Sequence, residues 1–140
     1  MTEELRRTNI RDEIARAEDA LKAAEALIPL ALFADAISRS YYGVFHALRA
    51  LAFTRGIEPR THAGVIHVFN TEFVRTGLFP SSFNRTLSGL QRSRELADYD
   101  AAVVFSEPDA RAELVDARAF VTAALAWLAS EGWLSSPGGT

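Results

Sequence analysis

Apolar side chains recur every three or four positions along most of the chain, the spacing that places them on one face of an α-helix. The first such run extends from Ile10 to Ile28 and ends at Pro29, because proline lacks a backbone donor and cannot continue a helix. No segment shows the strict alternation that is typical of a half-buried strand. The pattern predicts an all-α protein, an up-and-down bundle of about five helices.

Further helices are bounded by residues that favour helix ends. Ser, Thr and Pro are typical of first turns, and Gly of the position just past the last turn. The second predicted helix covers 32–55 and ends before Gly56. The third is capped by Thr61 and ended by Gly77. The fourth is opened by Pro80 and Ser81, and the fifth is capped by Ser106. A chain of 140 residues is long enough for one core. We expect a single domain over 1–134 and a flexible tail over 135–140.

The predicted second helix carries three stripes at helical spacing. An apolar stripe is expected to face the core of the monomer. It comprises Ile37, Tyr41, Val44, Leu48 and Leu51. A stripe of small side chains would let another helix approach closely. It comprises Ala36, Ser40, Gly43, Ala47 and Ala50.

The third stripe is polar and lies about 200° around the helix axis from the apolar one. It comprises Asp35, Arg39, Tyr42, His46 and Arg49. We therefore expect it to point almost directly away from the core. Tyr42 and the nearby Phe45 are costly to leave in water, which favours a partner surface there. The commonest partner is a second copy of the chain, related by a two-fold axis.

Composition narrows the function. The net charge of −3 argues against broad nucleic-acid binding, although it allows a small basic site. The chain has no cysteine, a charged N-terminal region and no apolar run long enough to span a bilayer, so we expect a cytoplasmic protein that does not bind membranes. His62 and His67 are five residues apart, which is not a ligand spacing, and we predict no metal site and no cofactor.

Arg39 and His46 are the candidate catalytic pair. They are seven residues apart, so both project from the same side of the helix. An arginine can hold a phosphate with a bidentate fork, and an imidazole can transfer protons at neutral pH. Together they could cleave RNA, which carries its own nucleophile in the 2′-hydroxyl. Candidate substrate-binding residues are Tyr42, Ser40, Arg49 and Arg94.

Two of these assignments compete with purely structural ones. Arg39 could form a surface ion pair with Asp35, four residues earlier. Arg94 lies on the apolar stripe of its own helix, which favours an internal ion pair with Asp98 over a role in the cleft. His62 is read as a packing or capping histidine.

The chain resembles the HEPN-domain family in its small stand-alone form. Residues 36–47, 61–65 and the Arg-x-x-Ala-Asp-Tyr run at 94–99 carry the resemblance, and the family pattern of an arginine, four to six residues and a histidine matches Arg39 and His46. The resemblance implies a helical bundle that forms homodimers through the motif helix. It also implies metal-independent RNA cleavage at the dimer cleft, leaving 2′,3′-cyclic phosphate ends, by a toxin often encoded beside a small nucleotidyltransferase antitoxin.

Two positions differ from common members of that family. Ser40 stands where many active members have asparagine directly after the arginine, and Leu48 stands where toxins inactivated by AMP transfer carry a tyrosine. An alternative therefore remains open: a non-catalytic module that binds nucleotide or RNA, or a scaffold partner of a nucleotidyltransferase. A plain helical interaction protein, in which the Arg39 stripe only builds a dimer, is a third possibility.

Overall fold

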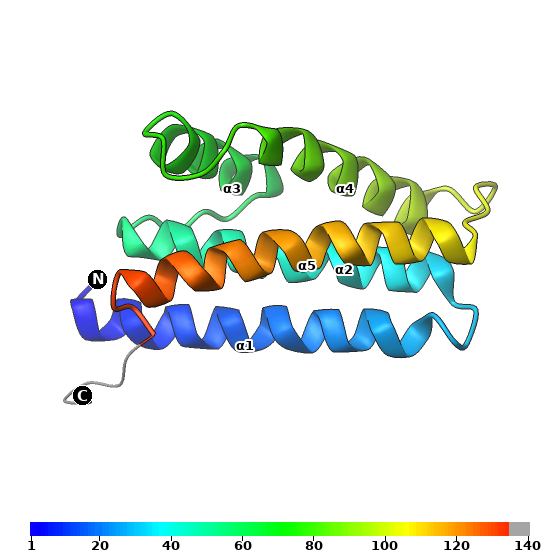
Figure 1. Ribbon diagram of the computed structural model, residues 1–140, viewed down its shortest axis with the longest axis horizontal. Helices are drawn as coiled ribbons and strands as arrows, with labels where there is room; N and C mark the ends of the chain where they lie inside the picture. Colours follow the sequence, from blue (N-terminus) through cyan, green and yellow to red (C-terminus); the bar gives the residue numbers. More distant parts are fainter. Residues whose placement is uncertain (135–140) are drawn as a thin grey trace.

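The computed structural model describes residues 1–134, and in that range it contains five α-helices and no β-strand. The all-α prediction is confirmed. Three long helices lie side by side, and two shorter ones cover one side of them (Figure 1). The long helices are α1 (Glu3–Leu27), α2 (Phe33–Thr54) and α5 (Glu107–Ser130); the shorter ones are α3 (His62–Phe69) and α4 (Ser82–Tyr99). The expected flexible tail lies outside the described residues.

The helix ends follow the local sequence. The Thr61 hydroxyl accepts a hydrogen bond from the backbone N–H of Gly64 at 2.9 Å and begins α3. Ser106 and Asp109 form a reciprocal capping box at the start of α5. The expected third helix is not a single α-helix. After α3 the chain continues as a π-helical turn, η1 (Asn70–Val74), and then reverses at Gly77, whose φ is +81°.

The small stripe of α2 packs against α1. Every member of this stripe is buried, and a Cβ atom added to Gly43 would lie 2.7 Å from Cδ2 of Leu21. Real side chains do not approach so closely, so glycine at position 43 sets how near the two helices can come. The close helix partner that the stripe predicts is therefore α1 of the same chain.

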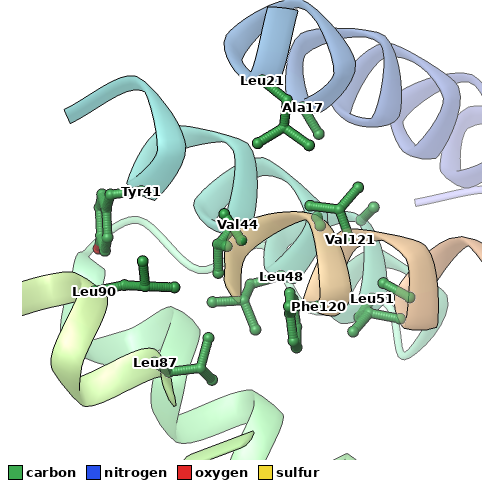
Figure 2. Packing of buried hydrophobic residues seen from close by; sticks show 14 of the residues in the cluster. Ala17, Leu21, Tyr41, Val44, Leu48, Leu51, Leu87, Leu90, Phe120 and Val121 are labelled. Carbon is green, nitrogen blue, oxygen red and sulfur yellow. The ribbon is translucent and has the colours of Figure 1, made fainter. Parts of the chain in front are cut away.

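The apolar stripe of α2 forms the centre of the core. Its side chains meet α4 and α5, with Leu87 and Leu90 on one side and Phe120 and Val121 on another (Figure 2). Because α1, α4 and α5 together cover most of α2, only one side of this helix remains open. We call that side the motif face; it comprises Arg39, Tyr42, Phe45, His46 and Arg49.

Candidate functional site on the open face of α2

Arg39 is the exposed end of the motif face. Its guanidinium carbon lies 4.9 Å from the centre of the Tyr42 ring, a cation–π contact that holds the side chain along the helix. Among the described residues no ion pair joins Arg39 to Asp35, so the surface pair considered from the sequence is not formed. The donors of the guanidinium thus remain available to a ligand on this face.

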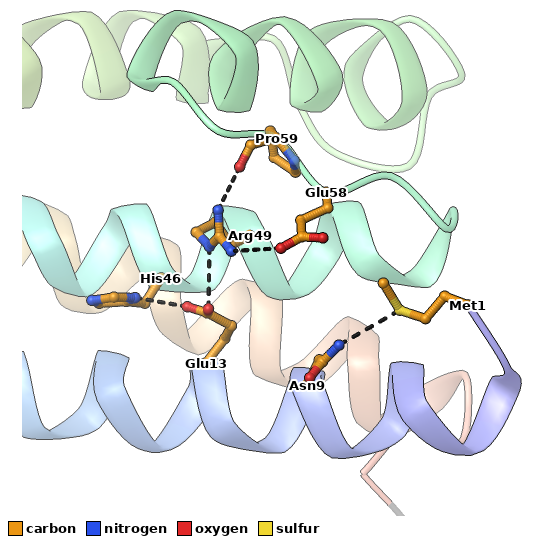
Figure 3. Close-up of polar contacts among 7 residues, drawn as sticks. All are labelled: Met1, Asn9, Glu13, His46, Arg49, Glu58 and Pro59. Carbon is orange, nitrogen blue, oxygen red and sulfur yellow. Dashed lines mark hydrogen bonds and ion pairs between the residues drawn. The ribbon is translucent and has the colours of Figure 1, made fainter.

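The phase of the polar stripe predicts that His46 points directly away from the core, and this prediction is wrong. His46 turns toward α1, where its Nδ1 lies 2.7 Å from Oε2 of Glu13 (Figure 3). Arg49 makes the same turn and donates from Nε to Oε1 of Glu13 at 3.1 Å. The physical reason is that α1 packs so closely on α2 that a carboxylate on α1 reaches both side chains.

Glu13 is a buried carboxylate shared by two partners. Its side chain is 9% exposed, and the side chains of His46 and Arg49 are 20% and 18% exposed. Burial alone would raise the pKa of Glu13, but the hydrogen bonds and charges of His46 and Arg49 outweigh it and hold that pKa below its ordinary value. Glu13 is therefore an anion that orients two residues of the motif face.

This contact also defines the chemistry of the imidazole. With Glu13 ionised, Nδ1 must carry the proton that makes the hydrogen bond, so in the neutral ring Nε2 is the basic nitrogen. Figure 3 shows the second ring nitrogen on the side of the ring away from Glu13. An imidazole held by a carboxylate in this way is suited to accept a proton at Nε2, because the carboxylate offsets the charge that the ring gains.

Arg49 makes more polar contacts within the protein than a surface arginine usually does. Besides Glu13, it donates to the backbone carbonyl of Pro59 and lies 3.9 Å from a carboxylate oxygen of Glu58 (Figure 3). These contacts link α2 to the loop before α3. Arg49 thus contributes positive charge at the edge of the motif face while most of its donors already serve the protein.

An aromatic network connects the motif face to α3. The ring of Phe45 lies 5.6 Å from His46 and 4.8 Å from His62, and Tyr42 lies 6.2 Å from His62, all between ring centres. His62 is the first residue of α3, so Thr61 as N-cap places it against α2. His62 is therefore packed against the motif face, in line with its reading as a packing histidine.

His62 is held differently from His46. Its Nδ1 lies 2.6 Å from the hydroxyl of Tyr41, a core residue of α2. Burial, partly offset by Arg94, raises the pKa of Tyr41 to about 12, so the hydrogen bond to Nδ1 is made by a neutral phenol. Burial and the nearby charge of Arg94 also lower the pKa of His62. This histidine is thus kept neutral.

Ser40 requires a correction. It is completely buried against α1, and its hydroxyl has no hydrogen-bond partner among the described residues. A side chain in this position cannot contact a substrate on the motif face. The reason is its place in the small stripe, where size matters for helix packing. An asparagine at this position would have to fit the same contact.

Arg94 is 5% exposed and lies at the other end of the aromatic network. Its guanidinium carbon lies 4.9 Å from the centre of the Tyr41 ring, and Nη1 lies 3.6 Å from Oδ2 of Asp98. The internal ion pair considered from the sequence is present. Its length leaves it weaker than a hydrogen-bonded pair.

The sequence analysis did not predict two polar contacts of the site. These are the contact of Glu13 with His46 and the contact of Tyr41 with His62. A signal for Glu13 existed, because it lies three residues after Ile10 and next to Ile14 on the buried side of the first helical pattern. A carboxylate at such a position needs a cationic partner. The identity of that partner depends on how the helices pair, which the pattern does not specify.

Metal binding and membrane insertion are two properties that residues 1–134 can be assessed for. No group of three or more His, Asp or Glu side chains in this range is arranged to hold a metal ion. None of the described helices combines the length and the apolar character needed to cross a membrane.

These features define an all-α protein with an arginine and a carboxylate-held histidine on one helix face. Comparison with known proteins identifies the class more closely. The model of the HEPN domain matches residues 10–127, and the chain belongs to the HEPN family. The match includes Glu13, the whole motif face and the Arg94 end of the aromatic network.

Several relatives cover most of the chain. "Putative toxin MJ0605" of Methanocaldococcus jannaschii is 35% identical over 117 residues, which cover 81% of this chain and 87% of the relative. "Putative toxin MJ0142" of the same organism is 31% identical, covering 86% of this chain and 82% of the relative. "UPF0332 protein glr0978" of Gloeobacter violaceus is 34% identical, covering 84% and 94%.

Proposed function

We propose that this protein is a metal-independent endoribonuclease of the HEPN type that acts as the toxin of a toxin–antitoxin pair. The observation that carries the proposal is the hydrogen bond between Glu13 and Nδ1 of His46, seven residues after an exposed arginine on the same helix. A basic nitrogen and a cation able to bind phosphate thus project from the same face of one helix, about two turns apart. The names of two relatives support the toxin assignment.

In the proposed reaction, Nε2 of His46 takes the proton of an RNA 2′-hydroxyl. The 2′-oxygen then attacks the adjacent phosphorus atom, and the bond from phosphorus to the 5′-oxygen breaks. The leaving 5′-oxygen takes a proton from an acid, and the products are a 2′,3′-cyclic phosphate and a 5′-hydroxyl. Arg39 binds the phosphate oxygens and stabilises the charge that develops on them.

A homodimer through the motif face would supply the acid. In a two-fold dimer each copy brings one His46, so one ring can act as base while its counterpart, already protonated, acts as acid. The exposed Arg39 and the half-buried rings of Tyr42 and Phe45 suit such an interface. Tyr42 would stack on a base or donate to the phosphate, and Arg49 would add positive charge at the rim.

A cleavage assay with purified protein in excess chelator tests this proposal. Single-stranded RNA is the substrate, and the variants are His46→Ala and Arg39→Ala, with His67→Ala and Arg75→Ala as exposed controls. We expect each motif variant to lower the cleavage rate by about 100-fold or more, since a general base and a charge-stabilising group each contribute on that scale. The two controls should retain the rate.

Equal cleavage by the wild-type protein and the His46→Ala variant would contradict catalysis by His46. RNA binding without any cleavage would instead support a non-catalytic binding module. Growth arrest on expression, lost with His46→Ala and relieved by a co-expressed small nucleotidyltransferase, is the expected result for a toxin and its antitoxin. Growth unaffected by the wild-type protein would contradict the toxin assignment.

A further inference from the structure

An open hollow of about 600 Å³ lies where α4 ends beside the start of α3. Its volume falls in the range of small-ligand sites. It adjoins the motif face through His62, which lines the hollow and contacts Phe45. The side chains that could recognise a ligand there are His62, Arg92, Arg94, Glu95, Tyr99 and Asp100.

Arg94 makes this hollow more than a surface depression. Its Nε is buried and has no hydrogen-bond partner among the described residues, and its nearest carboxylate oxygen lies 3.6 Å away. A buried guanidinium with unused donors is costly, since buried polar groups are normally hydrogen-bonded. Because Arg94 lines the hollow, an acceptor bound there lies beside a guanidinium whose Nε has no partner within residues 1–134.

Tyr99 supplies a second, independent feature. It is 78% exposed, and the centre of its ring lies 5.9 Å from the guanidinium carbon of Arg94. An exposed ring beside a cation is a platform on which a planar, polarisable group can stack.

The charges of the hollow indicate what kind of ligand fits. Arg92 and Arg94 are balanced by Glu95 and Asp100, so a bare phosphate would meet as much repulsion as attraction. A nucleobase fits better, because it is flat and uncharged and its edges carry both donors and acceptors. Guanidinium groups donate to base acceptors, and carboxylates accept from base amino groups.

We propose that this hollow is the subsite for one nucleobase of the RNA, stacked on Tyr99 and hydrogen-bonded by Arg92 and Arg94. This inference rests on the proposed function for the identity of the ligand as RNA. The rings of Phe45 and His62 lie between the hollow and His46, so a strand whose phosphate is held at the motif face can place a neighbouring base in the hollow.

Binding, measured apart from cleavage, tests the subsite. The His46→Ala protein is titrated with nucleoside 5′-monophosphates and with ribose 5-phosphate while the Arg94 Nε–H and Tyr99 signals are followed by NMR. We expect the nucleotides to shift both signals and ribose 5-phosphate to leave them in place. Tyr99→Ala should weaken nucleotide binding by about tenfold, the scale of one base–aromatic stack. Arg92→Ala should weaken it too.

Arg85→Ala is the matched control, because Arg85 is an exposed arginine of the same helix outside the hollow. It should leave nucleotide binding unchanged. Equal shifts with ribose 5-phosphate, or no shift with any nucleotide at millimolar concentration, would overturn the subsite. These results do not depend on cleavage, so a protein that cuts RNA but fails this titration refutes the subsite alone.

An oligoribonucleotide distinguishes an RNA base from a free nucleotide. Tyr99→Ala, made in the His46→Ala protein, should lower the affinity for the oligoribonucleotide by a factor similar to that for nucleotides. Unchanged affinity for the oligoribonucleotide alongside weakened nucleotide binding would overturn the assignment to RNA.

Discussion

Two histidines contact the same aromatic network on the open side of α2, and the chain holds them with different partners. His46 donates a hydrogen bond from Nδ1 to the carboxylate of Glu13, whereas Nδ1 of His62 is hydrogen-bonded to the phenol of Tyr41. The partner of His46 is an anion, whereas burial and the charge of Arg94 lower the pKa of His62 and favour its neutral ring. The comparison shows that neighbouring side chains, more than the residue type, determine the environment of an imidazole.

The largest expected difference between the two histidines is in catalysis. Glu13→Gln should lower RNA cleavage by about 100-fold, because an amide can donate to Nδ1 and favour the opposite tautomer of His46. Tyr41→Phe removes the corresponding partner of His62 and should change the cleavage rate by no more than about threefold, within the usual spread of such effects. Cleavage rates at saturating RNA measure both; a larger loss in Tyr41→Phe than in Glu13→Gln would reverse the assignment.

Folding stability provides the second comparison. Glu13→Ala leaves Arg49 and His46 without their shared anion and should lower the free energy of unfolding by about 2–3 kcal/mol, less than for a fully buried pair because both partners keep some exposure. Urea denaturation measures the change. Glu18→Ala, an exposed glutamate on α1, is the control and should stay within about 0.5 kcal/mol of the wild type. A loss that matches this control would mean that Glu13 is not a structural anchor.

Tyr41→Phe should have a smaller effect on stability. It keeps the ring in the core and removes the hydroxyl that bonds to His62 and interacts with Arg94, a change of about 1 kcal/mol. The same urea experiment measures it. A loss above about 3 kcal/mol would contradict this account, because it would exceed the contribution of one such hydroxyl.

The smallest expected effects are on the pH dependence of stability. The contributions of His62 and Glu13 to the free energy of unfolding should be lost in different pH ranges as the solution is acidified. The folded-state pKa of His62 lies below its ordinary value of 6.5, so its contribution is complete above pH 6.5 and is lost as the pH falls through the lowered pKa. The folded-state pKa of Glu13 lies below 4.5, so its contribution is present above pH 4.5 and is lost as the pH falls further.

Differences in unfolding free energy across pH resolve these two windows. The difference between wild type and His62→Gln should shrink as the pH falls below 6.5, and the difference between wild type and Glu13→Gln should shrink only below 4.5. If the His62 difference grows on acidification instead, its folded-state pKa is raised and the neutral assignment is wrong.

Much of the fold follows from local sequence. Thr61 and Ser106 begin helices where their side chains can cap, and the small stripe around Gly43 receives another helix closely, as its pattern predicts. The π-helical turn at Asn70–Val74 was not predicted, because its residues continue the helical pattern of α3 and only the packing that follows changes their hydrogen bonds.

The site could be predicted less completely. The phase of α2 correctly leaves Arg39 exposed, since that property depends on one helix alone. The orientation of His46 depends on Glu13, which is 33 residues away in the chain, and the partner of His62 depends on Tyr41, 21 residues away. Periodicity gives the angle of a side chain around its own helix but does not say which neighbouring helix lies there.

The ends of the RNA fragments test the central claim most directly. The account holds that His46 activates the 2′-hydroxyl of RNA. Cleavage of a defined single-stranded RNA in excess chelator should therefore leave a 2′,3′-cyclic phosphate and a 5′-hydroxyl, and a substrate with a 2′-deoxy sugar at the cut position should stay intact. Fragments ending in a 3′-hydroxyl and a 5′-phosphate, or cleavage of the deoxy substrate, would contradict it.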